Sequence, residues 1–107
     1  MNYIDALASE IESNLAEGDR PDRREQELYR LYALLVLVKG TEVSLGDVHQ
    51  AWSVWMVGDN PEHPALVPFD ELSTEQQQQD SPYAVAIRKA SLSWRAMLES
   101  DGRHLGE

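Results

Sequence analysis

Residues 25–40 read EQELYRLYALLVLVKG, and this stretch decides the fold class. The run begins with apolar residues at helical spacing and then becomes apolar almost all round. Leucine and β-branched residues would also suit a buried strand, but the length favours a helix. Gly40 follows the last apolar residues, where a C-cap is expected. We therefore predict a helix over 25–39 at the centre of a small bundle.

A second amphipathic pattern precedes this stretch, in YIDALASEIESNLA. Its apolar residues share one helical face at i, i+3, i+4 and i+7 spacing: Ile4, Leu7, Ala8, Ile11 and Leu15. Gly18 stands where a C-cap is wanted, so we predict a helix over 3–17. The polar, charged segment 18–25 predicts a loop between the two helices.

Helix signals also follow Gly40. Ser44 and Asp47 have the spacing of a capping box, in which each side chain accepts a hydrogen bond from the backbone amide of the other. The apolar side chains that follow form one stripe at three- and four-residue spacing: Leu45, Val48, Trp52 and Trp55. Gly58 marks the exit, so we predict a third helix between Ser44 and Gly58.

Prolines govern the next segment. Pro61, Pro64 and Pro68 are too closely spaced for a helix or a central strand, so 59–68 is predicted to be an ordered or extended crossing loop. The sequence STEQQQQD at 73–80 predicts a short helix with its first serine as the N-cap.

A last helix is predicted to open at Ser81, with Ser81 as the N-cap and Pro82 at the first helical position. One face of this helix carries apolar residues: Tyr83, Ile87, Ala90, Trp94, Met97 and Leu98. The polar tail 100–107 is predicted to fray.

Together these patterns predict an all-α fold: a compact bundle of about four helices, one short helical turn and a proline-rich crossing loop. A chain of 107 residues is long enough for one core, so residues 1–107 are expected to form a single domain. The expected core residues are Ile4, Leu7, Ile11, Leu28, Leu31, Leu35, Val38, Val48, Trp52, Ile87 and Trp94.

Charge and composition narrow the function classes. The formal net charge is -10, and no basic side chain lies between Lys39 and Arg88. Affinity for phosphate backbones comes largely from Lys and Arg, so nucleic acid is not an expected ligand. The chain has no cysteine, no long apolar run and no signal-peptide pattern, so we expect a cytoplasmic protein without a membrane segment or disulfides.

No catalytic or metal signature stands out. His49 and His63 lie near several carboxylates, but neither the HExxH nor the CxxC spacing of metal sites is present. The serines are better used as caps, and no G-x-S-x-G elbow or glycine-rich phosphate loop exists. We therefore predict a protein that is not an enzyme and that uses no metal or cofactor.

Two segments resemble the RyR domain, the repeat found in ryanodine receptors and in stand-alone bacterial and phage copies. The family pattern V/I-H-x-x-W matches VHQAW at 48–52. The pattern H-P-x-L-V-P-Y/F-x-x-L matches HPALVPFDEL at 63–72. A short and a final helix complete the likeness, which covers 47–90 and is most similar to short members from actinobacteria and their phages.

The resemblance implies an all-helical binding module that recognises a nucleotide-derived ligand in a cleft. Carried over onto this sequence, His49 and Trp52 line the pocket, with Trp52 offering a stacking face. His63, Pro68 and Phe69 form the opposing wall. A structural interpretation of the same residues stands beside this one: the loop is pinned onto the bundle by its apolar residues, and His63 caps a turn.

Two other function classes stay open. The acidic middle third is suited to docking a basic protein partner, or the domain pairs with itself. A nucleic-acid mimic is the third class, in which the acidic face occupies a basic groove. The arginines at 20, 23, 24 and 88 and Lys89 are the basic groups that would have to fold over the site to neutralise a phosphate.

Overall fold

The computed structural model describes residues 2–15 and 25–101 of the chain. Within these ranges the elements are helical and no strand occurs, which confirms the predicted all-α fold. The helices are α1 (Tyr3–Ser13), α2 (Gln26–Val38), α3 (Leu45–Asp59), α4 (Thr74–Gln78) and α5 (Ser81–Asp101), with 3-10 turns η3 (Gly40–Glu42) and η4 (Phe69–Glu71).

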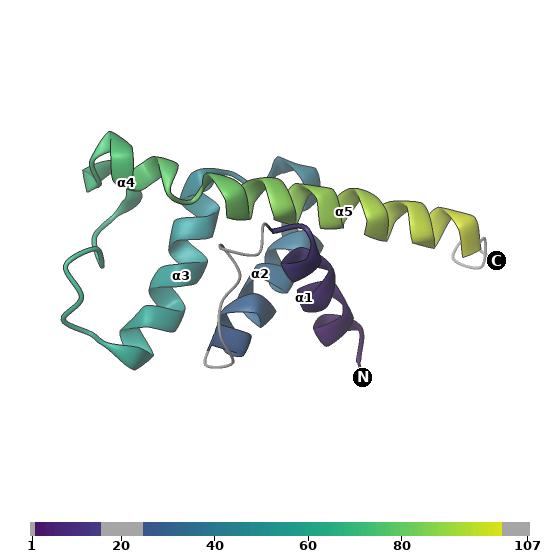
Figure 1. Cartoon of the computed structure of the whole chain (residues 1–107), viewed down its shortest axis with the longest axis horizontal. Helices are drawn as coiled ribbons and strands as arrows, with labels where there is room; N and C mark the ends of the chain where they lie inside the picture. The colour runs from purple at the N-terminus through teal and green to yellow at the C-terminus, as the bar shows by residue number, and fades with distance from the viewer. Residues whose placement is uncertain (1, 16–24, 102–107) are drawn as a thin grey trace.

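The long helix α5 organises the bundle. It lies across α1, α2 and α3, and its C-terminal half extends beyond them (Figure 1). Helices α1 and α2 pack on each other, and α2 also contacts α3. The segment that follows α3 loops away from the bundle and returns through η4 and α4 to the start of α5 (Figure 1).

The predicted capping box at Ser44 and the predicted N-cap at Ser73 are both confirmed. At the start of α3, the Asp47 amide donates to the Ser44 hydroxyl at 3.1 Å, and the Ser44 amide donates to the Asp47 carboxylate at 2.9 Å. Ser73 and Gln76 make the same reciprocal pair at α4. Local side chain to backbone bonds therefore fix where these two helices begin.

Some predicted helix ends were wrong. Helix α1 ends at Ser13 rather than at residue 17, because Asn14 takes the C-cap position; Gly18 lies outside the described residues. Helix α5 starts at Ser81 itself, since the amide of Ala84 already donates to the carbonyl of Asp80 at 3.0 Å. The same helix continues to Asp101, so residues 100 and 101 are helical, and the rest of the predicted tail lies outside the described ranges.

The core follows the predicted pattern with one exception. Five of the expected residues are buried: Leu7, Ile11, Leu28, Val48 and Ile87. Five more are partly buried against them: Ile4, Leu31, Leu35, Trp52 and Trp94. The prediction for Val38 was wrong, because its side chain is 64% exposed.

The orientation of α2 explains the exposure of Val38. This helix buries one face, which includes Tyr29, Tyr32 and Val36, and leaves Leu34 and Val38 on the opposite face in solvent. Its packing partners α1, α3 and α5 do not enclose it on all sides. An apolar sequence all round the helix therefore does not mean burial all round.

A pair of glycines gives a direct test of this backbone. Gly40 has φ +60°, and a Cβ there would lie 3.3 Å from the Ser91 hydroxyl oxygen. We expect Gly40→Ala to lower the free energy of unfolding by about 1–2 kcal/mol, because the left-handed region is costly for other residues. Gly58 lies inside α3, and no heavy atom beyond its own helix backbone and chain neighbours, in the described part of the chain, is within 4 Å of an added Cβ.

The matched change Gly58→Ala should therefore raise the free energy of unfolding, by up to about 1 kcal/mol, since alanine is the better helix former. Urea unfolding followed by circular dichroism measures both changes. Equal effects of the two substitutions would contradict the assigned backbone conformation at Gly40.

Candidate functional site

The crossing loop is folded back onto α3 by a buried histidine. The His49 ring is 4% exposed, and its Nε2 lies 2.7 Å from the carbonyl oxygen of Val67. Because a carbonyl oxygen only accepts, Nε2 carries the proton and donates it. His49 therefore holds the loop in place, a role that was not predicted for it from the sequence.

His63 fixes the loop from within. Its Nδ1 accepts a hydrogen bond from the Ala65 amide at 3.0 Å, so the predicted turn cap is confirmed. The ring proton of neutral His63 must then lie on Nε2, which is left as a donor. Backbone bonds from the His63 amide to Asn60 and from the Leu66 amide to His63 complete two turns.

The rings of the predicted site form one cluster. His49 stacks on Trp52 with centroids 5.6 Å apart, and His63 meets Trp52 nearly at right angles, at 5.0 Å. The ring centroids of Phe69 and His49 are 6.1 Å apart. Trp52 is thus held by both histidines, and its indole is part of the wall rather than a free stacking platform.

Two hollows flank the loop. The first, which we call the acidic pocket, has a volume of about 590 Å³ and lies between α3, α4, the starts of α2 and α5, and the inner side of the loop. The second, which we call the outer groove, has about 890 Å³ and lies between α3 and the other side of the loop.

The five predicted site residues do not share one cavity. His49, Trp52 and His63 line the acidic pocket. Pro68 and Phe69 line the outer groove, and His49 also contributes to the wall of that groove. Along the loop, His63 and Ala65 line the acidic pocket, whereas the residues from Leu66 to Asp70 line the outer groove.

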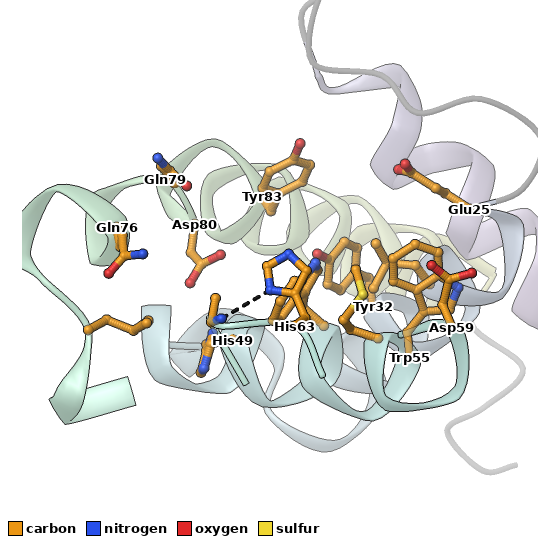
Figure 2. Close-up of a pocket in the computed structure, with 15 residues that line it drawn as sticks. Glu25, Tyr32, His49, Trp55, Asp59, His63, Gln76, Gln79, Asp80 and Tyr83 are labelled. Atoms are coloured by element: carbon orange, nitrogen blue, oxygen red, sulfur yellow. Dashed lines mark hydrogen bonds between the residues drawn. The ribbon is translucent and has the colours of Figure 1, made fainter. Parts of the chain in front are cut away.

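Other elements supply the rest of the acidic pocket. Tyr32 comes from α2, Trp55 and Asp59 from α3, and Asp80 and Tyr83 from the α4 to α5 junction. In Figure 2, Asp80 lies with Gln76, Gln79 and His49 on one side of His63, while Trp55, Asp59 and Glu25 lie on the other. The pocket is therefore elongated, with carboxylates toward both ends.

Burial shifts two ionisable groups of this pocket. Partial burial raises the pKa of the Asp80 carboxyl, an effect that nearby His49 partly offsets. Burial also raises the pKa of the Tyr32 hydroxyl well above its usual value, with further contributions from Tyr29, Tyr83 and Asp80. Both shifts mean that the surroundings disfavour additional negative charge.

No described residue that lines the acidic pocket is a Lys or an Arg. Arg88 is engaged elsewhere, since its Nε and Nη2 donate to the Val43 carbonyl at 3.0 and 2.7 Å. Lys89 is exposed on α5. The arginines at 20, 23 and 24 lie outside the described residues.

A family model matches residues 2–92, which is most of the chain, and is described as a domain of unknown function, DUF7701. The chain belongs to the DUF7701 family. No curated protein and no solved structure matches significantly. The match carries no information on the RyR resemblance, which stays a prediction.

The DUF7701 match includes every residue that lines the two hollows and ends inside α5. Within the described part of this DUF7701 chain, no three His, Asp or Glu residues are grouped to hold a metal ion. Nor does any helix in 2–15 or 25–101 combine the length and apolarity needed to cross a membrane.

Proposed function

We propose that this DUF7701 domain is a binding module, not an enzyme, that holds the ring of a small nucleotide-derived ligand in the acidic pocket. The observation that carries the proposal is the pocket itself. Its volume of about 590 Å³ lies in the range of small-molecule sites, roughly 300–1,000 Å³. Aromatic side chains from three helices line it beside carboxylate, amide and imidazole groups, which offer both ring surfaces and hydrogen-bond partners to a ligand.

The geometry of the pair formed by Ser53 and His49 supports binding rather than catalysis. Ser53 Oγ lies 3.4 Å from His49 Nε2, the nitrogen that donates to Val67. A nitrogen that carries its proton cannot take another from the serine. His49 therefore does not act as a general base toward Ser53, and its position fits the role of a structural anchor.

Charge decides how a nucleotide-derived ligand would lie. Its ring would enter the pocket against Trp55 and Tyr83, where flat aromatic surfaces are available. Any phosphate would have to point to solvent, because Asp59 and Asp80 line the pocket and would repel it. We therefore expect bases and nucleosides to bind more tightly than the corresponding phosphates.

Thermal unfolding with a panel of adenine, adenosine, ADP-ribose and cyclic nucleotides tests the proposal. A ligand present at 100 times its Kd should stabilise the domain by about 2.7 kcal/mol, which raises the Tm by several degrees at this size. The shift should be lost in Trp55→Ala and kept in Val54→Ala, whose side chain is exposed and lies outside the pocket. A shift that Trp55→Ala retains would place the ligand elsewhere, and no shift at all would count against a nucleotide-derived ligand.

A protein-interaction module is the second candidate. The open face of α2 carries Leu34, Leu37 and Val38 in solvent, and apolar side chains grouped in this way favour contact with another chain. Light scattering of the wild type and of Leu34→Glu would reveal self-association through this face, as a smaller mass for the variant.

A further inference from the structure

Two polar groups of the acidic pocket have no hydrogen-bond partner among the side chains of the described residues. Tyr32 is 2% exposed, and no described residue hydrogen-bonds to its hydroxyl, which points toward the His63 side of the pocket in Figure 2. The Asp80 carboxylate is half-buried on the other side of His63 in Figure 2, and no side chain of the described residues donates to it or pairs with it. A ligand that reaches both groups would give each of them a hydrogen-bond or ionic partner that the described residues do not supply.

We infer that the acidic pocket selects an organic cation, a flat ring with a positive charge placed between Asp80 and the Tyr32 hydroxyl. The inference rests on the proposed function and specifies the ligand class of the same site. It also restricts the nucleotide-derived candidates to those whose ring is cationic, such as an N-alkylated heterocycle.

Electrostatics favours a cation over a neutral ring of the same shape. Asp80 and Asp59 place carboxylates toward the two ends, and no Lys or Arg of the described residues lines the space between them. Attraction between opposite charges is stronger in a partly desolvated site than in bulk water. A positive ring would therefore gain from both carboxylates, whereas an anionic ring would meet repulsion.

Aromatic faces favour the same class of ligand. Trp55 and Tyr83 line the pocket, and the faces of indole and phenol rings attract cations through their quadrupoles. The Tyr32 hydroxyl would accept a hydrogen bond from an amide or amine on the ring. The combination of carboxylate, phenol and indole groups is a recurrent solution for binding organic cations.

Three probes that share one ring test the charge preference directly: 1-methylnicotinamide, a cation; nicotinamide, which is neutral; and nicotinate, an anion. Titrations followed by NMR or calorimetry should show that the cation binds at least tenfold more tightly than nicotinamide, and that nicotinate binds most weakly. In Asp80→Asn the preference for the cation should fall to threefold or less, while nicotinamide binding stays within about twofold of wild type.

Asp70→Asn is the matched control. Asp70 is exposed and lines the outer groove, so its substitution should leave the tenfold preference unchanged. Loss of the preference in this control to the same degree as in Asp80→Asn would overturn the inference, because the effect would then come from the overall charge.

The outcomes separate this inference from the proposed function. If nicotinamide and its methylated cation bind equally and both are lost in Trp55→Ala, the pocket binds rings and the charge preference is wrong. If none of the three probes and none of the nucleotide panel binds, the proposed function and this inference fail together.

Asp80→Asn should also fold, and stability provides an independent readout. Burial raises the pKa of Asp80, so the folded state holds its proton to a higher pH than the unfolded state does. Stability then falls as the pH rises from the ordinary pKa of an aspartate, 3.8, through the raised pKa of Asp80. We expect Asp80→Asn to have a higher Tm than wild type at pH 7, a gain that disappears at pH values below the ordinary aspartate pKa.

The nearby His49 ring partly offsets the effect of burial on the pKa of Asp80, so the gain in Tm of Asp80→Asn should be modest. An equal or lower Tm for Asp80→Asn at pH 7 would show that the carboxylate is already satisfied in the free protein, and that outcome would overturn the cation inference.

Discussion

Replacing His49 with alanine should lower the free energy of unfolding by about 3 kcal/mol. The substitution removes a buried ring that packs on Trp52 and Phe69, and the space it leaves is surrounded by side chains that cannot fully close it. It also leaves the Val67 carbonyl without the hydrogen bond that holds the loop. Chemical denaturation at neutral pH measures the loss.

A volume-conserving variant separates the two causes. His49→Phe keeps most of the packing but removes the donor, so it should cost about 1–2 kcal/mol, the cost of an unmet buried acceptor. Gln50→Ala, at the exposed neighbouring position, should change stability by less than about 0.5 kcal/mol. A loss of similar size in His49→Phe and Gln50→Ala would contradict the anchoring role of His49.

Ile87→Ala should have an effect of comparable size, about 2–5 kcal/mol. The Ile87 side chain is fully buried, with 0% exposure, in the N-terminal half of α5, where that helix crosses the others. Truncating it opens a cavity in the one core of the domain. The measurement is the midpoint of urea unfolding, together with a denaturant slope that stays the same as in wild type.

Leu92→Ala is the control on the same helix. Leu92 is 56% exposed, so its truncation should alter stability by less than about 0.5 kcal/mol. Similar losses for the two variants would show that α5 does not pack on the bundle through the face that carries Ile87.

Much of the fold was predictable because its signals are local. The serine caps at Ser44 and Ser73 need only a partner three residues away, and both were placed correctly. Helical spacing likewise found Leu7, Ile11, Val48 and Ile87 in the core. These features depend on neighbours in sequence, which a single chain reveals.

The error at Val38 had a different origin. Its surroundings depend on which side of α2 the other helices occupy, and the apolar sequence of α2 is nearly the same on all sides. Two small residues of α5 were missed for a related reason: Ala84 and Ala86 are buried by close helix approach, which composition does not indicate.

For the candidate site, the sequence indicated the right segment but not the right cavity. His49, Trp52 and His63 do meet, because two of them share a helix and the loop that carries the third returns to it. Tyr32 and Asp80 join them only through tertiary packing of α2 and the start of α5. No local signal marked these two residues, since a tyrosine on an apolar helix and an aspartate after glutamines are both common.

The placement of α5 has a consequence for how the chain reaches its native state during synthesis. Ile87 and its neighbouring alanines fill the centre of the core, and α5 contacts α1, η3, α2 and α3, all of which leave the ribosome earlier. Until α5 emerges, the core cluster that contains Leu7, Ile11 and Val43 lacks Ile87 and the buried alanines. Helices α1, α2 and α3 therefore cannot bury their apolar faces in the native way before α5 is available, and the native core forms cooperatively once α5 joins them.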